Sequence, residues 1–99
     1  MLTQEQYSEQ LYKEDPLLLQ VKNTIAAKGM PEVSVEPGYG RLLSMLVSLS
    51  RSSSILEIGA LGGYSGICLA RGLTVGGTLT SLELKAEYAE VARGNLDLA

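Results

Sequence analysis

The chain has 99 residues, 45% of them hydrophobic and 19% charged, with a formal net charge of −3, one cysteine and no histidine. This composition predicts one small folded domain, and it excludes internal disulfides, cysteine-rich metal sites and histidine chemistry from these residues. Because the chain lacks a cluster of Lys and Arg and a signal-peptide pattern, we expect a cytoplasmic protein that binds a small molecule, with neither nucleic acid nor membrane as partner.

Residues 1–50 predict three helices and a lead-in loop. Thr3 followed three residues later by Gln6 is a capping-box pattern, and Asp15 before a proline is typical of a helix N-cap. The helices are expected at 4–13, 16–28 and 39–50, with a loop rich in proline and glycine at 30–38. The third helix has a broad apolar face that should cover a sheet, formed by Leu42, Leu43, Leu46, Val47 and Leu49.

Residues 51–99 predict a βαβα unit with two parallel strands. Its elements are expected at 54–58 (strand), 64–72 (helix), 78–84 (strand) and 85–99 (helix). The first strand, SILEI, is short and mostly apolar, as expected of a strand that is buried on both faces of a parallel sheet. The last helical pattern reaches Ala99 without a stop signal, so we expect a sequence that is cut short. The chain is therefore interpreted as a single partial domain of the α/β class.

A glycine loop between the first strand and the next helix is the strongest candidate for a binding site. In EIGALGGYS, residues 57–65, a strand end passes through glycines to a helix N-terminus, where backbone N–H groups point outward. A dinucleotide fingerprint requires glycines where Leu61 and Tyr64 stand, so a pyrophosphate site and a dinucleotide-dependent oxidoreductase are disfavoured. A tight turn whose glycines serve packing alone is the alternative interpretation.

Two acidic residues favour a ligand over a packing role. Glu57 lies in an apolar strand, where a buried carboxylate without a partner is costly. A ligand ammonium or a network of N–H groups and hydroxyls would supply that partner, and an ion pair or a solvent-reaching strand end is the alternative. Glu83 closes the second strand 24 positions after Gly59, near the separation at which an acid accepts hydrogen bonds from ribose hydroxyls. This pair of acids suits a nucleoside without a diphosphate.

The segments ILEIGALGGYSGICLARGL and GGTLTSLEL resemble the cofactor motifs of class I methyltransferases, most closely those of the catechol and caffeoyl-CoA O-methyltransferase family. The lead-in VSVEPGYGRLL is similar to that family's segment before the helix that precedes the first strand. The resemblance covers about residues 10–99. It implies the N-terminal part of a Rossmann-like fold, with three helices followed by the βαβα unit, and S-adenosylmethionine as the cofactor.

The resemblance also implies which residues contact the methionine end of the cofactor. Glu57 and the backbone of Gly59 and Ala60 would hold this end. Ser65 would hydrogen-bond the methionine carboxylate, and Val35 would contribute a contact from the lead-in loop.

Glu83 would hold the ribose, and the implied reaction is methyl transfer to a hydroxyl group of a small-molecule acceptor. Family members often use a divalent cation such as Mg²⁺, whose ligands would lie beyond Ala99 together with the catalytic base. No catalytic or metal-binding residue is therefore assigned within these residues. We expect a fragment of an O-methyltransferase that is inactive alone. The alternative is a non-catalytic S-adenosylmethionine-binding or self-associating module, such as a homodimer that pairs through open strand edges.

Overall fold

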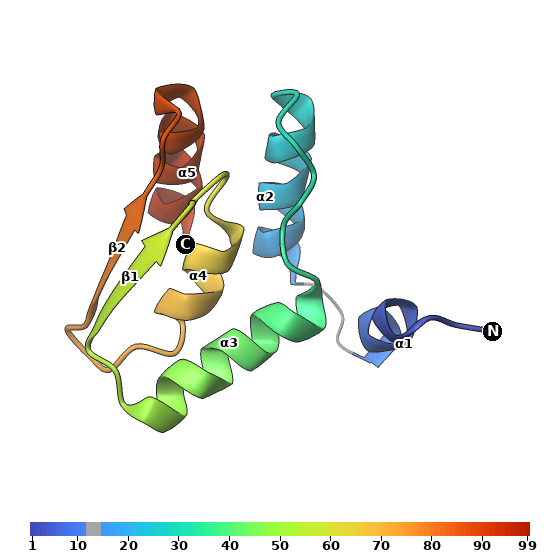
Figure 1. Cartoon of the computed structure of the whole chain (residues 1–99), viewed down its shortest axis with the longest axis horizontal. Coiled ribbons are helices and arrows are strands. Elements are labelled where there is room, and N and C mark those ends of the chain that lie inside the picture. The colour runs from blue at the N-terminus through green and yellow to red at the C-terminus, as the bar shows by residue number, and fades with distance from the viewer. Residues whose placement is uncertain (12–14) are drawn as a thin grey trace.

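The structure is a computed structural model that describes residues 1–11 and 15–99, apart from the side chain of residue 9. Its elements, labelled in Figure 1, are α1 (Gln4–Leu11), α2 (Pro16–Ala27), α3 (Pro37–Ser50), β1 (Ser54–Ile58), α4 (Tyr64–Ala70), β2 (Thr78–Leu82) and α5 (Ala86–Leu98). Every predicted helix and strand is present, in the predicted order. The predicted end of the first helix, at residue 13, lies outside the described residues.

The first two helices begin where side-chain oxygens accept hydrogen bonds from free backbone N–H groups. At α1, the Gln6 N–H donates to Thr3 Oγ1 over 3.1 Å and the Thr3 N–H donates to Gln6 Oε1 over 2.9 Å, which confirms the predicted capping box. At α2, Asp15 Oδ1 accepts from the Leu18 N–H at 2.9 Å, and Pro16 is the first helical residue. Both helices therefore begin at the predicted residues.

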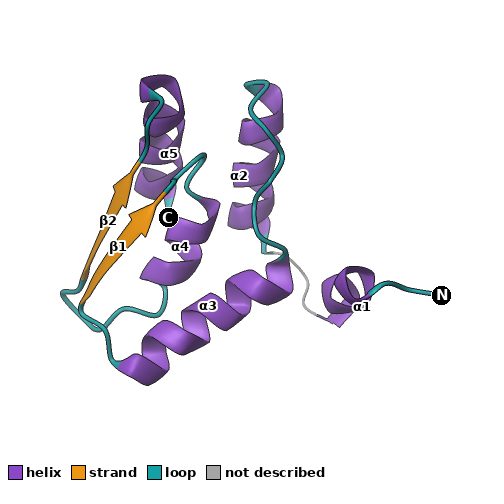
Figure 2. Cartoon of the chain, viewed as in Figure 1, coloured by secondary structure: helices purple, strands orange, loops and turns teal. Residues whose placement is uncertain are grey.

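Helix α3 begins at Pro37, two residues before the predicted start at Tyr39, because the fixed φ of proline suits the first helical turn. It packs beside α4 (Figure 2), and Ser44 Oγ donates to the carbonyl oxygen of Cys68 over 2.5 Å. Only Val47 of the predicted apolar face is buried. The prediction that this face covers a sheet is wrong, because α4 contacts both α3 and β2 and takes the position next to the sheet.

Strands β1 and β2 pair in parallel, with a register that runs from Ser54 opposite Thr78 to Ile58 opposite Leu82. Alternate residues are half-buried, whereas the intervening ones are exposed, for example Leu56 at 61% and Ile58 at 81%. The prediction that the first strand is buried on both faces is therefore wrong. Helices α4 and α5 lie on one side of the two strands (Figure 1), and none of the described residues covers the other side.

The core lies between α2, α4 and the loop that follows α2. Its buried residues are Leu18, Val21, Ile25, Met30, Tyr64, Ile67 and Cys68. Asn95 of α5 is also buried, and its Nδ2 donates to the carbonyl oxygen of Gly62 over 2.8 Å. These contacts hold the glycine loop between α2 and α5. Among the described residues, no helix combines the length and the apolar character that crossing a bilayer requires.

Candidate functional site

Residues 59–63 form the loop that leaves the carboxyl end of β1 and leads into α4. Gly59 and Gly63 have φ values of +91°, and Leu61 has a φ of +47°, all in the left-handed region. A Cβ added to Gly59 would meet no atom within 4 Å, so open space lies beside this residue. Gly59 is therefore needed for its backbone angle, and the space beside it is available to a ligand.

Two other glycines of the loop serve packing. A Cβ added to Gly62 would overlap the side chain of Ile25. A Cβ added to Gly63 would lie 3.2 Å from the carbonyl oxygen of Ala92, which is tighter than most contacts of real Cβ atoms. Packing thus explains these two glycines, whereas it does not explain Gly59.

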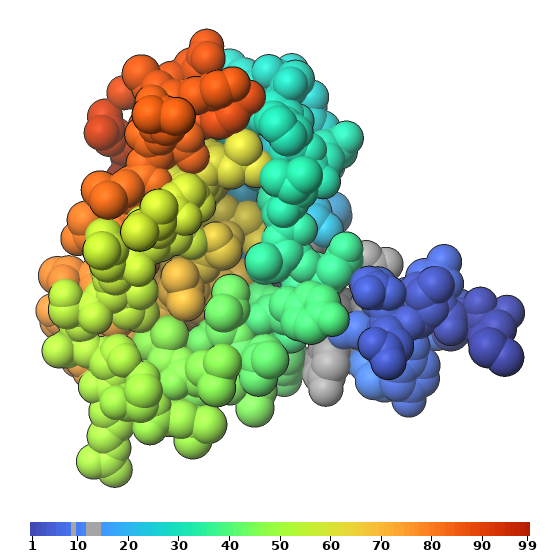
Figure 3. All heavy atoms as spheres, in the orientation of Figure 1, coloured from blue at the N-terminus to red at the C-terminus, as the bar shows by residue number. Residues whose placement is uncertain are grey.

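An open cavity of about 240 Å³ lies over the glycine loop and faces the segment between α2 and α3. It is lined by Val33, Ser34, Val35, Gly59, Ala60, Leu61, Tyr64 and Ser65. Figure 3 shows residues 30–36, in teal, meeting the yellow loop on this face of the molecule. The cavity brings together four residues that the resemblance assigned to the methionine end, namely Val35, Gly59, Ala60 and Ser65.

Glu57 lies behind this cavity and is held by two hydroxyl groups. Its Oε2 accepts from Ser65 Oγ, and its Oε1 accepts from Ser81 Oγ at 2.9 Å. The side chain is half-buried, so a network of hydroxyls supplies the partner that the sequence required. Because Ser65 lines the cavity and Glu57 does not, the structure connects Glu57 to the cavity through Ser65.

Glu83 directly follows β2, which ends at Leu82, two residues before the predicted end of the strand. Its Oε1 accepts from the Leu61 N–H at 2.8 Å, and its Oε2 accepts from the Lys85 N–H at 3.1 Å. The backbone donors of Lys85 and Leu61 lower the pKa of Glu83 below its usual value, so its carboxylate is charged at neutral pH. Glu83 is thus attached to the glycine loop as an anion.

A second cavity, of about 380 Å³, lies between β2 and α5 and has Glu83 in its wall. Ala60 lines both this cavity and the cavity over the glycine loop. Ser65 lines the first cavity and Glu83 lines the second, so the two ends of the predicted site belong to two cavities that share Ala60.

Several residues of this region were not predicted from the sequence. They are Val33, Ser34, Leu61, Tyr64 and Ser81. Ser81 lies opposite Glu57 in the sheet register, 24 residues later in the chain. Gly59 and Glu83 are separated by the same 24 positions. Counting 24 positions from Glu57 leads to Ser81, so this spacing is a sequence signal that could have located Ser81. Leu61 and Tyr64 lie within the glycine segment 57–65 itself, whereas the places of Val33 and Ser34 depend on how distant segments meet.

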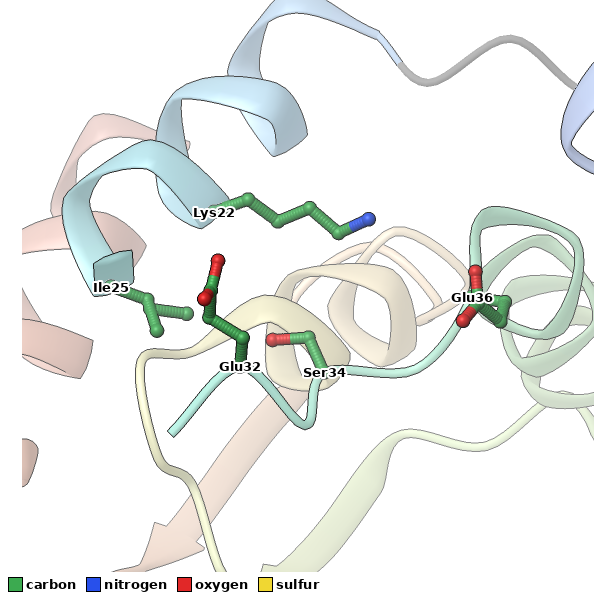
Figure 4. Close-up of a pocket in the computed structure, with 5 residues that line it drawn as sticks. All are labelled: Lys22, Ile25, Glu32, Ser34 and Glu36. Atoms are coloured by element: carbon green, nitrogen blue, oxygen red, sulfur yellow. The ribbon is translucent and has the colours of Figure 1, made fainter. Parts of the chain in front are cut away.

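A smaller cavity, of about 180 Å³, lies between α2 and the other side of the segment that follows it. It is lined by Lys22, Ile25, Glu32, Ser34 and Glu36 (Figure 4). Lys22 reaches from α2 toward the segment, and its Nζ lies 5.6 Å from the centroid of the Tyr64 ring. Ser34 lines this cavity and the one over the glycine loop, so the two cavities share one wall.

Comparison with known proteins identifies the family of this chain. The O-methyltransferase family model matches residues 5–99. The chain belongs to the O-methyltransferase family. The resemblance inferred from the glycine loop and the second strand is therefore confirmed.

Two relatives of this O-methyltransferase chain are named catechol O-methyltransferase. The protein from Niastella koreensis is 44% identical over 92 residues, which cover 93% of this chain and 42% of the relative. The protein from Mycobacterium tuberculosis is 38% identical over 89 residues, which cover 90% of this chain and 40% of the relative. The chain thus spans about two-fifths of the length of the curated relatives it matches.

Solved O-methyltransferase structures show the same arrangement of elements. The enzyme from Bacillus cereus in complex with SAH aligns with a TM-score of 0.89 and 41% identity, over 94% of this chain and 43% of that chain. TomG from Streptomyces achromogenes in complex with SAM aligns with a TM-score of 0.84 and 35% identity, over 99% of this chain and 47% of that chain. These likenesses confirm the predicted fold class, part of a Rossmann-like methyltransferase fold.

Proposed function

We propose that this chain provides the S-adenosylmethionine-binding part of an O-methyltransferase that methylates a hydroxyl group of a small molecule. One observation carries the proposal: the loop that lines the cavity is hydrogen-bonded, at Leu61, to the charged carboxylate of Glu83. Support comes from the two related structures in complex with SAH and SAM, at 41% and 35% identity. Membership of the O-methyltransferase family favours this function over a non-catalytic module.

The methionine end of the cofactor would occupy the cavity over the glycine loop. Gly59 leaves open space beside its Cα, and Val35 adds an apolar contact from the opposite wall. Ser65 offers a hydroxyl group that can bind the methionine carboxylate. Glu57, which lies directly behind Ser65, places a negative charge near the ammonium group. The residues present therefore fit both charged groups of the methionine end.

The ribose of the cofactor would lie against Glu83, on the other side of Ala60. Each oxygen of this carboxylate accepts one backbone N–H, and each retains a lone pair that can accept from a ribose hydroxyl. The backbone of Ala60 would contact the cofactor between its two ends, because this residue lines both cavities. The spacing of these groups suits a nucleoside that is joined to an amino acid.

The bound cofactor would supply the methyl group, and the residues of this chain bind and orient it. Among the side chains that the structure describes, no three of His, Cys, Asp or Glu come together to hold a metal ion. The acceptor pocket, the base and any Mg²⁺ site are proposed for the part of the relatives' length that this chain does not span. We therefore expect the 99-residue chain to bind the cofactor without transferring its methyl group.

Isothermal titration calorimetry tests this function on the purified chain, with circular dichroism to verify that the chain is folded. SAH is expected to bind and NADH is not. Glu83→Ala should weaken SAH binding by about tenfold, the loss expected for hydrogen bonds to a charged group. The matched control is Glu87→Ala, which removes an exposed acid from the first turn of α5 and should leave binding unchanged. A folded chain that binds NADH, or that does not bind SAH, would contradict the proposal.

A further inference from the structure

The two carboxylate oxygens of Glu57 are held by serines from two different elements. Ser81 of β2 lies opposite Glu57 in the sheet register, and its Oγ donates to Oε1 over 2.9 Å. Ser65 of α4 donates to Oε2. All three side chains are half-buried between the sheet and α4. The position of the Glu57 carboxylate therefore depends on two independent donors.

The two donors line different cavities. Ser65 lines the cavity over the glycine loop, where the methionine carboxylate would lie, whereas Ser81 lines the second cavity, between β2 and α5. A serine hydroxyl carries a single proton, so Ser65 cannot donate to a ligand carboxylate and to Glu57 at the same time. When Ser65 turns toward a ligand, its hydrogen bond to Glu57 is lost. Ser81 has no such competing partner in that cavity, and its proton stays with Glu57.

The space around Glu57 leaves its carboxylate little freedom toward α4. A Cβ added to Gly66 would lie 3.2 Å from Glu57 Oε1 and 3.3 Å from Leu79 Cδ2, so the backbone of α4 already passes close to both side chains. The carboxylate is thus confined between α4 and β2. Within this space, the hydrogen bonds from Ser65 and Ser81 fix its rotation, and the one from Ser81 remains when Ser65 turns away.

We infer that Ser81 is a positioning residue, which holds Glu57 in place after Ser65 has turned to the cofactor. The carboxylate then stays close enough to attract the ammonium group of the methionine end. This inference rests on the proposed function, because it assigns Ser81 a task in binding the methionine end. It predicts that loss of the Ser81 hydroxyl affects only ligands that carry this end.

Ligand selectivity separates this task from a general structural role. Ser81→Ala should weaken binding of SAH by about tenfold and leave binding of adenosine, which lacks the methionine end, within about twofold. Ser81→Thr keeps the hydroxyl on a side chain that suits a strand, and it should restore SAH binding. The matched control is Thr80→Ala, which removes a hydroxyl from the exposed face of β2 and should affect neither ligand. Equal losses for SAH and adenosine, or no loss for either, would overturn the inference.

The positioning role of Ser81 can also be measured in the absence of a ligand. The side-chain carboxyl carbon of Glu57 gives an NMR signal that can be assigned by its loss in Glu57→Gln. We expect this signal to move in Ser81→Ala and to stay in place in Thr80→Ala, with circular dichroism showing that both variants are folded. An unmoved signal would overturn the positioning role of Ser81. If the signal moves in Ser81→Ala but the wild-type chain does not bind SAH, only the proposed function would be rejected.

Discussion

Arg71 Nη1 lies 2.5 Å from Asp15 Oδ2, and this ion pair joins the start of α2 to the end of α4. The same carboxylate caps α2, because its other oxygen accepts the N–H of Leu18. One side chain therefore both begins a helix and attaches that helix to the element that carries Ser65. The two charged side chains are 42% and 38% exposed, so water screens their attraction.

Removing Asp15 is expected to cost more stability than removing Arg71. Asp15→Ala loses the helix cap, worth about 1 kcal/mol, and also the exposed ion pair, worth about 0–1 kcal/mol. Arg71→Ala loses only the ion pair. Asp15→Asn keeps a capping oxygen and should therefore resemble Arg71→Ala in urea unfolding. Equal destabilisation by Asp15→Asn and Asp15→Ala would show that the cap contributes nothing.

Acidification is expected to destabilise the chain through two carboxylates. The hydrogen bond from Arg71 lowers the pKa of Asp15 from 3.8, and the backbone donors of Lys85 and Leu61 lower the pKa of Glu83 from 4.5. Both groups bind protons more weakly in the folded chain than in the unfolded chain. Their contribution to the free energy of unfolding is therefore fully present above their usual pKa values, and it is lost as the pH falls through the lowered pKa values of the folded chain.

Urea midpoints at pH 7, 5, 4 and 3 measure this effect. The midpoint should stay constant down to about pH 5 and then fall. Glu83→Gln removes one of the two groups, so the fall between pH 5 and 3 should become shallower. The matched control is Glu87→Gln, which replaces an exposed acid of the same type. A midpoint that rises on acidification would reverse the sign and contradict the assignment.

Local signals predicted the starts of α1, α2 and α4 and the first strand, because the chemistry that sets them lies within a few residues. The Thr3 and Gln6 side chains form their two hydrogen bonds across one helical turn, and the SILEI segment is a strand at the predicted bounds. Burial was predicted less well. Leu56 is 61% exposed, since burial on both faces of a strand requires elements that the described chain does not provide.

The structure brings together the candidate residues of the glycine loop, whereas a contact that depends on strand pairing was missed. Gly59, Ala60 and Ser65 are close in the chain, and the cavity brings them together as expected. The contact between Glu57 and Ser81 follows instead from the sheet register, which the motif alone does not specify. The binding roles of these residues are proposals that the ligand titrations test.

Alanine substitutions at two glycines should separate stability from ligand binding. Gly62→Ala places a methyl group against Ile25 and should destabilise the fold by about 1–3 kcal/mol. Gly59→Ala meets no neighbouring atom but is strained by its φ of +91°, which should cost about 1 kcal/mol. Since its new methyl group occupies the open space beside the loop, Gly59→Ala should weaken SAH binding more strongly than Gly62→Ala does.

Urea unfolding and calorimetry of the two variants test this separation. Gly94→Ala is the control, because Gly94 lies within α5 with no atom near its added Cβ and should gain about 1 kcal/mol of stability. Ile25→Val in the Gly62→Ala background should recover part of the lost stability. The same affinity loss in the Gly59 and Gly62 variants would show that open space beside Gly59 has no special role.

The uncovered face of the sheet is expected to drive self-association of the 99-residue chain. Four large apolar side chains are more than half exposed on or next to this face: Leu56 at 61%, Ile58 at 81%, Leu82 at 52% and Leu84 at 97%. Both strands also have an unpaired edge within the described two-stranded sheet, and such edges pair readily with another chain. Light scattering coupled to size-exclusion chromatography should therefore detect dimers or larger species at micromolar concentration.

A charge on this face should reduce the association. Leu56→Lys places an ammonium group in the middle of the exposed face, and its desolvation would oppose pairing, so the apparent mass should fall toward that of a monomer. Val75→Lys is the matched control, because Val75 is fully exposed in the turn before β2 and belongs to neither strand. If both variants lower the mass equally, net charge rather than the apolar face controls association. A wild-type chain that is monomeric at every concentration would contradict the expected self-association.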